Sequence, residues 1–112
     1  MNTLISYIYR DGNNYKQGFE LIVPGKMDKD FILDCCDEGE YFIPGQVGLP
    51  ELQGQMINFP SDADHVWHEL EEIVFTDDQP TLDITAEQLQ QNFEEAKDNW
   101  QVESAMERLG TS

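Results

Sequence analysis

Lysine and arginine are absent from a long central stretch of this 112-residue chain. Between Asp30 and Ala96 the sequence has neither residue, although it has seventeen aspartates and glutamates there. The whole chain carries 6 Lys and Arg against 23 Asp and Glu, a formal net charge of −17. Few of the central acids have a basic neighbour in sequence, so we expect their charge to face solvent or a basic partner. Direct nucleic-acid binding is disfavoured, because it requires cations opposite the phosphates.

Cysteine and long apolar runs are also scarce. Cys35 and Cys36 are adjacent, and neighbouring cysteines do not form an unstrained disulfide. The amino-terminal residues 1–12 lack the basic and apolar regions of a signal peptide, and no apolar run reaches the length of a membrane span. Two thiols without an export signal predict a cytoplasmic protein.

Apolar residues are nonetheless sufficient for a folded core. They make up 39% of the chain, with six Phe, four Tyr and two Trp, which excludes a disordered acidic tail. The length is near the commonest domain size, and repeats and low-complexity segments are absent. We predict a single domain over residues 1–112.

Alternating side chains predict a β-hairpin at the amino terminus. Residues 3–9 alternate as a strand, residues 11–14 favour a turn, and residues 19–23 form the returning strand. A helix should follow, from a cap at Asp28 to about Asp37. Its buried stripe has helical spacing and comprises Phe31, Ile32, Cys35 and Cys36.

The middle of the chain mixes strand and loop patterns. Residues 40–43 favour a third strand, and the Gly- and Pro-rich residues 44–55 favour an ordered surface loop. Residues 63–74 have apolar side chains at helical spacing, but 73–76 are typical of a strand. We predict a short helical turn near 62–66 and a strand over about 68–76.

Thr85 and Gln88 form a capping box that begins a carboxyl-terminal helix. After Trp100 the apolar positions move to nearly the opposite side of a continuous helix. Either the chain breaks near residues 98–99 and folds back onto the domain, or the last turns contact another subunit as a homodimer. The predicted fold class is α+β, with about four antiparallel strands packed against two helices in the order ββα-β-loop-β-α.

Residues 62–69 suggest a metal site, since Asp62, Asp64, His65, His68 and Glu69 are close in sequence. A closed zinc site needs four convergent ligands, and a calcium loop needs a central Gly, which this segment lacks. Two histidines three apart on a strand would also point to opposite faces. We predict no metal and no cofactor.

The cysteines are weak candidates for a nucleophile with a histidine base. Cys35 and Cys36 lie near the carboxyl end of the predicted helix among acids, an environment that disfavours the thiolate. Carboxylate pairs for acid–base hydrolysis have no diagnostic value where acids are so abundant. No phosphate-binding loop or nucleophile elbow is present. We predict that the protein is not an enzyme.

The acid clusters at 34–40, 61–72, 76–79 and 93–98 carry the functional signal. We predict that they replace phosphates opposite the Lys and Arg of a partner, with Trp67 or Tyr41 as an anchor unless these lie in the core. The predicted contact residues are Asp34, Asp37, Glu38, Glu40, Asp62, Asp64, Glu69, Glu71, Glu72, Asp77 and Asp78.

Three segments resemble those of small uncharacterised proteins of bacteria and their mobile elements: NTLISYIYRDGNNYK (2–16), DEGEYFIPGQVGLP (37–50) and WHELEEI (67–73). This resemblance implies no activity. In size and acidity alone, the chain is similar to the phage-encoded DNA mimics that inhibit CRISPR and restriction enzymes. Those inhibitors share no motif with it, so no functional residue is carried over.

We therefore expect a non-enzymatic, nucleic-acid-mimicking inhibitor that occludes the basic groove of a nucleic-acid-binding host or defence protein, without contacting nucleic acid or membrane itself. The alternative is a small binding or scaffold module that uses its carboxyl-terminal helix and Gly/Pro loop. Salt separates the two, because an electrostatic mimic loses affinity as ionic strength rises and an apolar module does not.

Overall fold

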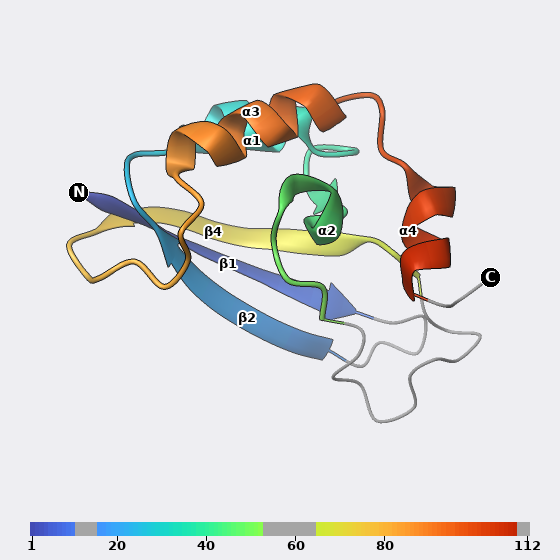
Figure 1. Ribbon diagram of the computed structural model, residues 1–112, viewed down its shortest axis with the longest axis horizontal. Coiled ribbons are helices and arrows are strands. Elements are labelled where there is room, and N and C mark those ends of the chain that lie inside the picture. The colour runs from blue at the N-terminus through green and yellow to red at the C-terminus, as the bar shows by residue number, and fades with distance from the viewer. Residues whose placement is uncertain (11–15, 53–64, 110–112) are drawn as a thin grey trace.

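The computed structural model describes residues 1–10, 16–52 and 65–109 (Figure 1). The strands are β1 (Asn2–Arg10), β2 (Lys16–Val23), β3 (Tyr41–Phe42) and β4 (His68–Thr76), and the helices are α1 (Lys29–Cys35), α2 (Pro44–Val47), α3 (Ala86–Ala96) and α4 (Val102–Leu109). The strands form one antiparallel sheet in the order β2-β1-β4-β3. Helices α1, α2 and α3 lie over one face of this sheet (Figure 1). The predicted α+β class is confirmed.

The β1–β2 hairpin is where the sequence predicted it. Thr3 pairs with Val23 and Arg10 with Lys16, in an unbroken antiparallel register. Along β1, Ile5, Tyr7 and Tyr9 are at most 1% exposed and face the helices. We call this side of the sheet the covered face. The alternate residues of β1 point to the opposite side, which no described helix covers, and we call it the outer face.

Strand β4 spans His68–Thr76, so the strand interpretation of this segment is confirmed. β4 pairs with β1, and the register shifts between Ser6 and Tyr7. Ser6 pairs with Glu72 and Tyr7 with Leu70, which leaves Glu71 as the extra residue of a β-bulge. The turn predicted near residues 62–66 falls mainly on residues outside those described.

Helix α1 begins as predicted, because the Asp28 carboxylate accepts a hydrogen bond from the Phe31 backbone N–H at 3.2 Å. It ends at Cys35, about two residues before the predicted end. The chain then turns tightly, with the Glu40 N–H donating to the Asp37 carbonyl at 3.2 Å. Glu38 and Gly39 both have positive φ, 54° and 78°, so the helix cannot continue through them.

The predicted Gly/Pro loop holds a short helix at its start, α2. A proline at its first turn suits helix initiation, and Gly48 ends it in the left-handed region at φ 94°. A Cβ at Gly48 would also lie 3.3 Å from the Ile84 side chain, so both backbone and space favour glycine. The loop prediction was therefore wrong for these four residues, and residues 53–55 lie outside those described.

The carboxyl-terminal chain folds back onto the domain. Helix α3 starts at the predicted cap, where Thr85 Oγ1 accepts from the Gln88 N–H at 3.1 Å. Asp98 adopts a left-handed φ of 58° shortly after α3 ends, and α4 follows in a new direction. Ala105 of α4 is 1% exposed and packs with Ile43 and Val66. Of the two predicted alternatives, the structure therefore has the break and the return.

Candidate acidic interface

The outer face of the sheet carries a hollow bordered by glutamates. Ser6 on β1 lies between Glu20 on β2 and Glu72 on β4, because it pairs with both. The bulge adds Glu71 to the same rim. The hollow has a volume of about 470 Å³, and its lining also includes Ile8. Three carboxylates from two strands thus border one depression.

Small side chains create that depression. Gly18 pairs with Ile8, and a Cβ placed on Gly18 would be in ordinary contact with the Ile8 side chain at 3.7 Å. A Cβ would therefore fit at Gly18, and the absence of a side chain there leaves space next to Ile8. Ser6 adds only a hydroxymethyl group to the floor. A long side chain from a partner could enter here, and the surrounding carboxylates favour one with a positive charge.

Carboxylates also gather around Tyr41 at the β3 edge. Tyr41 pairs with Glu69 of β4 and directly follows the Asp37–Glu40 turn. Its phenol pKa is raised, first by the charge of Glu40 and further by partial burial, Glu69 and Glu38. Arg10 acts in the opposite direction. Three carboxylates therefore act on this one ring.

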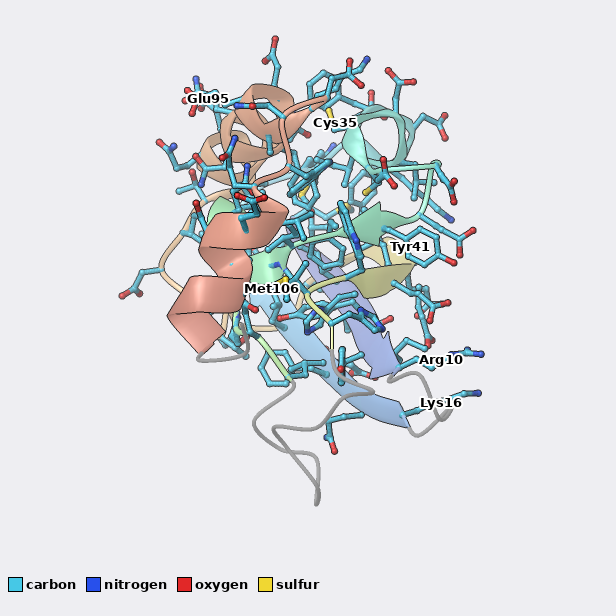
Figure 2. All side chains as sticks on the ribbon, turned by 90° about the vertical axis from the view of Figure 1, so that its right-hand side faces the viewer. Arg10, Lys16, Cys35, Tyr41, Glu95 and Met106 are labelled. Carbon is cyan, nitrogen blue, oxygen red and sulfur yellow. The ribbon has the colours of Figure 1, made fainter. Side chains whose placement is uncertain are left out.

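Arg10 is a basic residue within this region, and its strand partner on β2 is Lys16. Its Nε lies 3.1 Å from Glu69 Oε2, and the two side chains are 39% and 24% exposed. Figure 2 shows Arg10 and Tyr41 on the same side of the molecule, pointing away from α4. One ion pair thus links the outer face of β1 to β4, at the residue that pairs with Tyr41 of β3.

We name these outer-face acids and their neighbours at the β3 edge the sheet-face patch, which comprises Glu20, Glu38, Glu40, Glu69, Glu71 and Glu72. It crosses all four strands, about 14 Å at a spacing of about 4.8 Å between strands. Six carboxylates less the charge of Arg10 leave five negative charges over that width. Duplex DNA of the same length carries about eight phosphates at one per about 1.7 Å. The patch is thus somewhat more than half as dense as a duplex.

The structure brings five of the predicted contact residues into this patch: Glu38, Glu40, Glu69, Glu71 and Glu72. Asp37 pairs with Tyr41 and lies beside it.

The other predicted contact residues are elsewhere. Asp34 accepts a hydrogen bond from Lys97 Nζ at 2.8 Å and belongs to the α1–α3 side. Asp77 and Asp78 follow the far end of β4, and Asp62 and Asp64 lie outside the described residues.

Glu20 was missed by sequence reasoning. It is isolated among apolar residues of β2, and only the pairing of β1 with both β2 and β4 brings it to Glu72. Alternation within β2 does indicate that it faces away from Leu21 and the core. To predict that Glu20 lies near Glu72, the order of the strands in the sheet must be known, and alternation does not reveal that order.

Both histidines are held by backbone groups. His68 is fully buried, its Nε2 accepts from the Leu52 N–H at 3.1 Å, and its Nδ1 lies 3.2 Å from the Val66 carbonyl. Burial lowers its pKa to about 3, so the ring is neutral and donates from Nδ1.

His65 is engaged in the same way. Its Nδ1 accepts from the Trp67 N–H, and its Nε2 donates to the Arg10 carbonyl at 2.6 Å. Neither histidine presents a vacant nitrogen for a metal or for proton transfer, and the role of each is structural.

The cysteines lie in the core. Cys35 and Cys36 are 3% and 7% exposed, and both are free thiols. Burial raises the pKa of Cys36 to about 12 and also raises that of Cys35, where Lys97 only partly offsets it. Neither is a thiolate at neutral pH, so neither suits nucleophilic attack.

Trp67 packs with Trp100 at 6.3 Å between ring centroids, within the small core under α4. Of the two predicted anchors, Tyr41 is therefore the one beside the patch.

No three His, Cys, Asp or Glu side chains converge as metal ligands in the part of the chain that the structure describes. Among the described helices, none combines the length and the apolarity that crossing a bilayer requires. No protein-family model, curated protein or solved structure matches the chain.

Proposed function

We propose that this protein is a non-enzymatic inhibitor that binds the basic groove of a nucleic-acid-binding protein through the sheet-face patch. The supporting observation is the convergence of Glu20, Glu71 and Glu72 on one hollow, next to the carboxylates around Tyr41. Lys and Arg side chains that normally hold phosphates would enter this hollow or contact its rim. The target chemistry is thus a basic protein surface.

The charge density of the sheet-face patch, which is lower than that of duplex DNA, suits reversible competition with nucleic acid for the groove. A charge density somewhat more than half that of a duplex attracts the same cations but binds each stretch of groove less strongly. Tyr41 adds a flat ring beside the charges, which can stack on an arginine guanidinium. The protein would therefore bind best where arginines lie beside an apolar contact.

The alternative, a binding module that docks through its carboxyl-terminal helix, has less support. Ala105 on the apolar side of α4 is buried against Ile43 and Val66 of the same chain. A partner would have to displace this packing before it reached that surface. The Gly/Pro loop offers no free apolar face at α2 either, because Val47 is fully buried.

The experiment compares two triple variants of equal charge. One is Glu20→Gln/Glu71→Gln/Glu72→Gln in the patch, and the other is Glu87→Gln/Glu94→Gln/Glu95→Gln on the exposed side of α3. Each changes the net charge from −17 to −14. Proteins captured from a bacterial lysate at about 50 mM salt by the unaltered chain would be identified and then challenged with duplex DNA and RNA.

We expect captured nucleic-acid-binding proteins that both the added nucleic acid and about 200 mM salt release. The patch variant should lose this capture by about tenfold or more, whereas the α3 variant should keep most of it. Equal loss in both variants would mean that net charge alone is responsible. Capture that excludes nucleic-acid-binding proteins would refute the proposal.

A further inference from the structure

Strand β4 has an open edge, which begins next to the residues of β4 that line the hollow. Its neighbour on that side, β3, is only two residues long, and the pairs are Tyr41 with Glu69 and Phe42 with His68. The last backbone bond across this boundary runs from the Leu70 N–H to the Glu40 carbonyl at 3.0 Å. Beyond Leu70, no strand in the described part of the chain pairs with β4 there. An unpaired edge of this length is a ready template for another strand.

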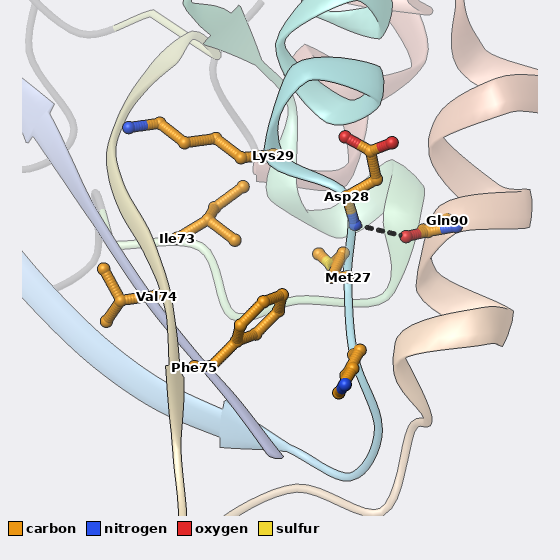
Figure 3. Close-up of a pocket in the computed structure, with 8 residues that line it drawn as sticks. Met27, Asp28, Lys29, Ile73, Val74, Phe75 and Gln90 are labelled. Atoms are coloured by element: carbon orange, nitrogen blue, oxygen red, sulfur yellow. Dashed lines mark hydrogen bonds between the residues drawn. The ribbon is translucent and has the colours of Figure 1, made fainter. Parts of the chain in front are cut away.

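A groove of about 490 Å³ runs along this edge (Figure 3). Ile73 and Phe75 project from β4 toward the segment that carries Met27, and Val74 projects to the opposite side. Phe75 is 53% exposed and Val74 is 42% exposed, so large apolar side chains flank the open edge on both sides. The far wall is fixed, because the Asp28 N–H donates to Gln90 Oε1 at 2.7 Å.

Two cations border the groove in a chain that has few. Lys26 Nζ lies 5.9 Å from the centre of the Phe75 ring, and the Lys29 side chain extends toward β4. Neither lysine forms an ion pair with any of the described residues. Acids stand at both ends of the open edge, Glu71 and Glu72 before it and Asp77 and Asp78 after it. The charge order along the edge is therefore acidic, basic, acidic.

We propose that this groove binds an extended partner segment that adds a fifth strand to the sheet beside β4. The complementary segment is acidic at its centre, to meet Lys26 and Lys29, and basic at both ends. Its alternate residues are β-branched and apolar and lie beside Val74. Backbone pairing would supply affinity and this charge order would supply specificity.

A second copy of the chain fits this edge poorly. In an antiparallel pair centred on Val74, Glu71 of one copy would face Asp77 of the other at both ends. Like charges directly opposite one another are destabilising, and the net charge of −17 per copy adds to the repulsion. The flanking acids thus oppose self-pairing and leave the edge available to a different partner.

The groove shares no lining residue with the hollow on the outer face, and its test does not depend on the proposed inhibition. The probe is an end-capped, fluorescently labelled peptide of sequence Lys-Val-Glu-Val-Glu-Val-Lys, followed by fluorescence anisotropy. The control is Glu-Val-Lys-Val-Lys-Val-Glu, which has the same composition and net charge in the opposite order. We expect the control to bind about tenfold more weakly, since the two central charges that meet Lys26 and Lys29 change sign.

Substitutions on the protein locate the contact. Lys29→Glu should weaken binding of the first peptide about fivefold and strengthen binding of the control. Lys16→Glu makes the same change of net charge on β2, away from the groove, and should leave the preference intact. If Lys29→Glu and Lys16→Glu changed the affinity of the first peptide equally, the peptide would not bind in this groove.

Backbone methylation tests strand addition itself. Only alternate residues of an edge strand direct their backbone N–H groups toward the neighbouring strand. One peptide is methylated on the amide nitrogens of its odd residues and a second on those of its even residues. Binding should be lost in one of these two peptides only. We expect a loss of about tenfold or more in that peptide and little change in the other. Equal affinities of the two methylated peptides would overturn strand addition, as would a concentration-dependent dimer that Phe75→Ala dissociates.

Discussion

On the covered face of the sheet, β1 places Ile5, Tyr7 and Tyr9 at no more than 1% exposure, whereas on its outer face the same strand places Ser6 and Ile8 next to glutamates. Polar atoms on the covered face have a defined partner, as where the Tyr7 hydroxyl donates to the Pro50 carbonyl at 2.5 Å. Burial raises the pKa of Tyr7 and keeps its phenol neutral. The acids beside β1 thus lie on the outer face and not on the covered face. A change of charge on the outer face should therefore leave the core intact.

The largest expected difference between the faces comes from removing an aromatic ring. Phe42 is fully buried and packs edge-on against Tyr7, with 5.2 Å between ring centroids. Phe42→Ala should lower the free energy of unfolding by about 3–5 kcal/mol, measured by urea denaturation. Val74→Ala on the outer face should lower it by less than about 1 kcal/mol. Similar losses at the two sites would contradict the assignment of covered and outer faces.

Lowering the pH should destabilise the folded protein through His68, which is buried on the covered face. Its pKa is about 3 in the folded protein against 6.5 for an ordinary histidine, so the unfolded chain binds one more proton between these values. Stability from this group is present above pH 6.5 and is lost as pH falls, by about 1.4 kcal/mol per unit.

The expected loss is therefore about 2.5 kcal/mol between pH 8 and 4.5, measured by urea denaturation at each pH. His68→Gln removes the titrating group, and the difference in slope between the two proteins isolates it from the many carboxylates. Parallel pH profiles of the two proteins would show that His68 does not cause the loss.

A smaller effect is expected from the turn that supports the patch. Glu38 has a left-handed φ of 54°, a conformation that costs a non-glycine residue about 1–2 kcal/mol. Glycine avoids this strain, but it loses more backbone entropy on folding than glutamate does, which offsets part of the gain. Glu38→Gly should therefore stabilise the protein by about 0.5–1 kcal/mol in thermal unfolding. Gly39→Ala should do the opposite by about 1 kcal/mol, although a Cβ there meets no atom within 4 Å. A stable Gly39→Ala variant would show that the turn is not held in this form.

The smallest effect compares two single charges. Glu72 lies among acids on the outer face, so Glu72→Gln should raise the unfolding midpoint by about 1–3 °C at low salt, and this gain should vanish near 1 M salt. Glu87 lies in the first turn of α3, where an acid is favourable, so Glu87→Gln should lower the midpoint by about the same amount. Shifts of the same sign would mean that net charge outweighs position.

Much of this fold was predictable because its signals are local. Alternation predicted β1 and β2, β-branched residues predicted β4, and the caps at Asp28 and Thr85 predicted two helix starts. Helix α2 was not predictable by periodicity, since four residues barely complete one turn.

The site was less predictable, because it depends on which strands are neighbours. Glu69, Glu71 and Glu72 were predicted as contacts from charge alone, but Glu20 joins them only through the central position of β1. Conversely, Asp34 is close to Asp37 in sequence but is paired with Lys97 on the helical side. Charge density along the chain therefore predicted an acidic surface but not which acids lie together on it.

The central position of β1 also bears on how the chain acquires its structure. As the polypeptide leaves the ribosome, β1 can join β2 at once, whereas its other neighbour begins only at His68. Until then one side of an aromatic-rich strand has no partner, and sequence-distant pairings of this kind form slowly. Aggregation or chaperone capture would thus compete with folding until residues 68–76 have emerged.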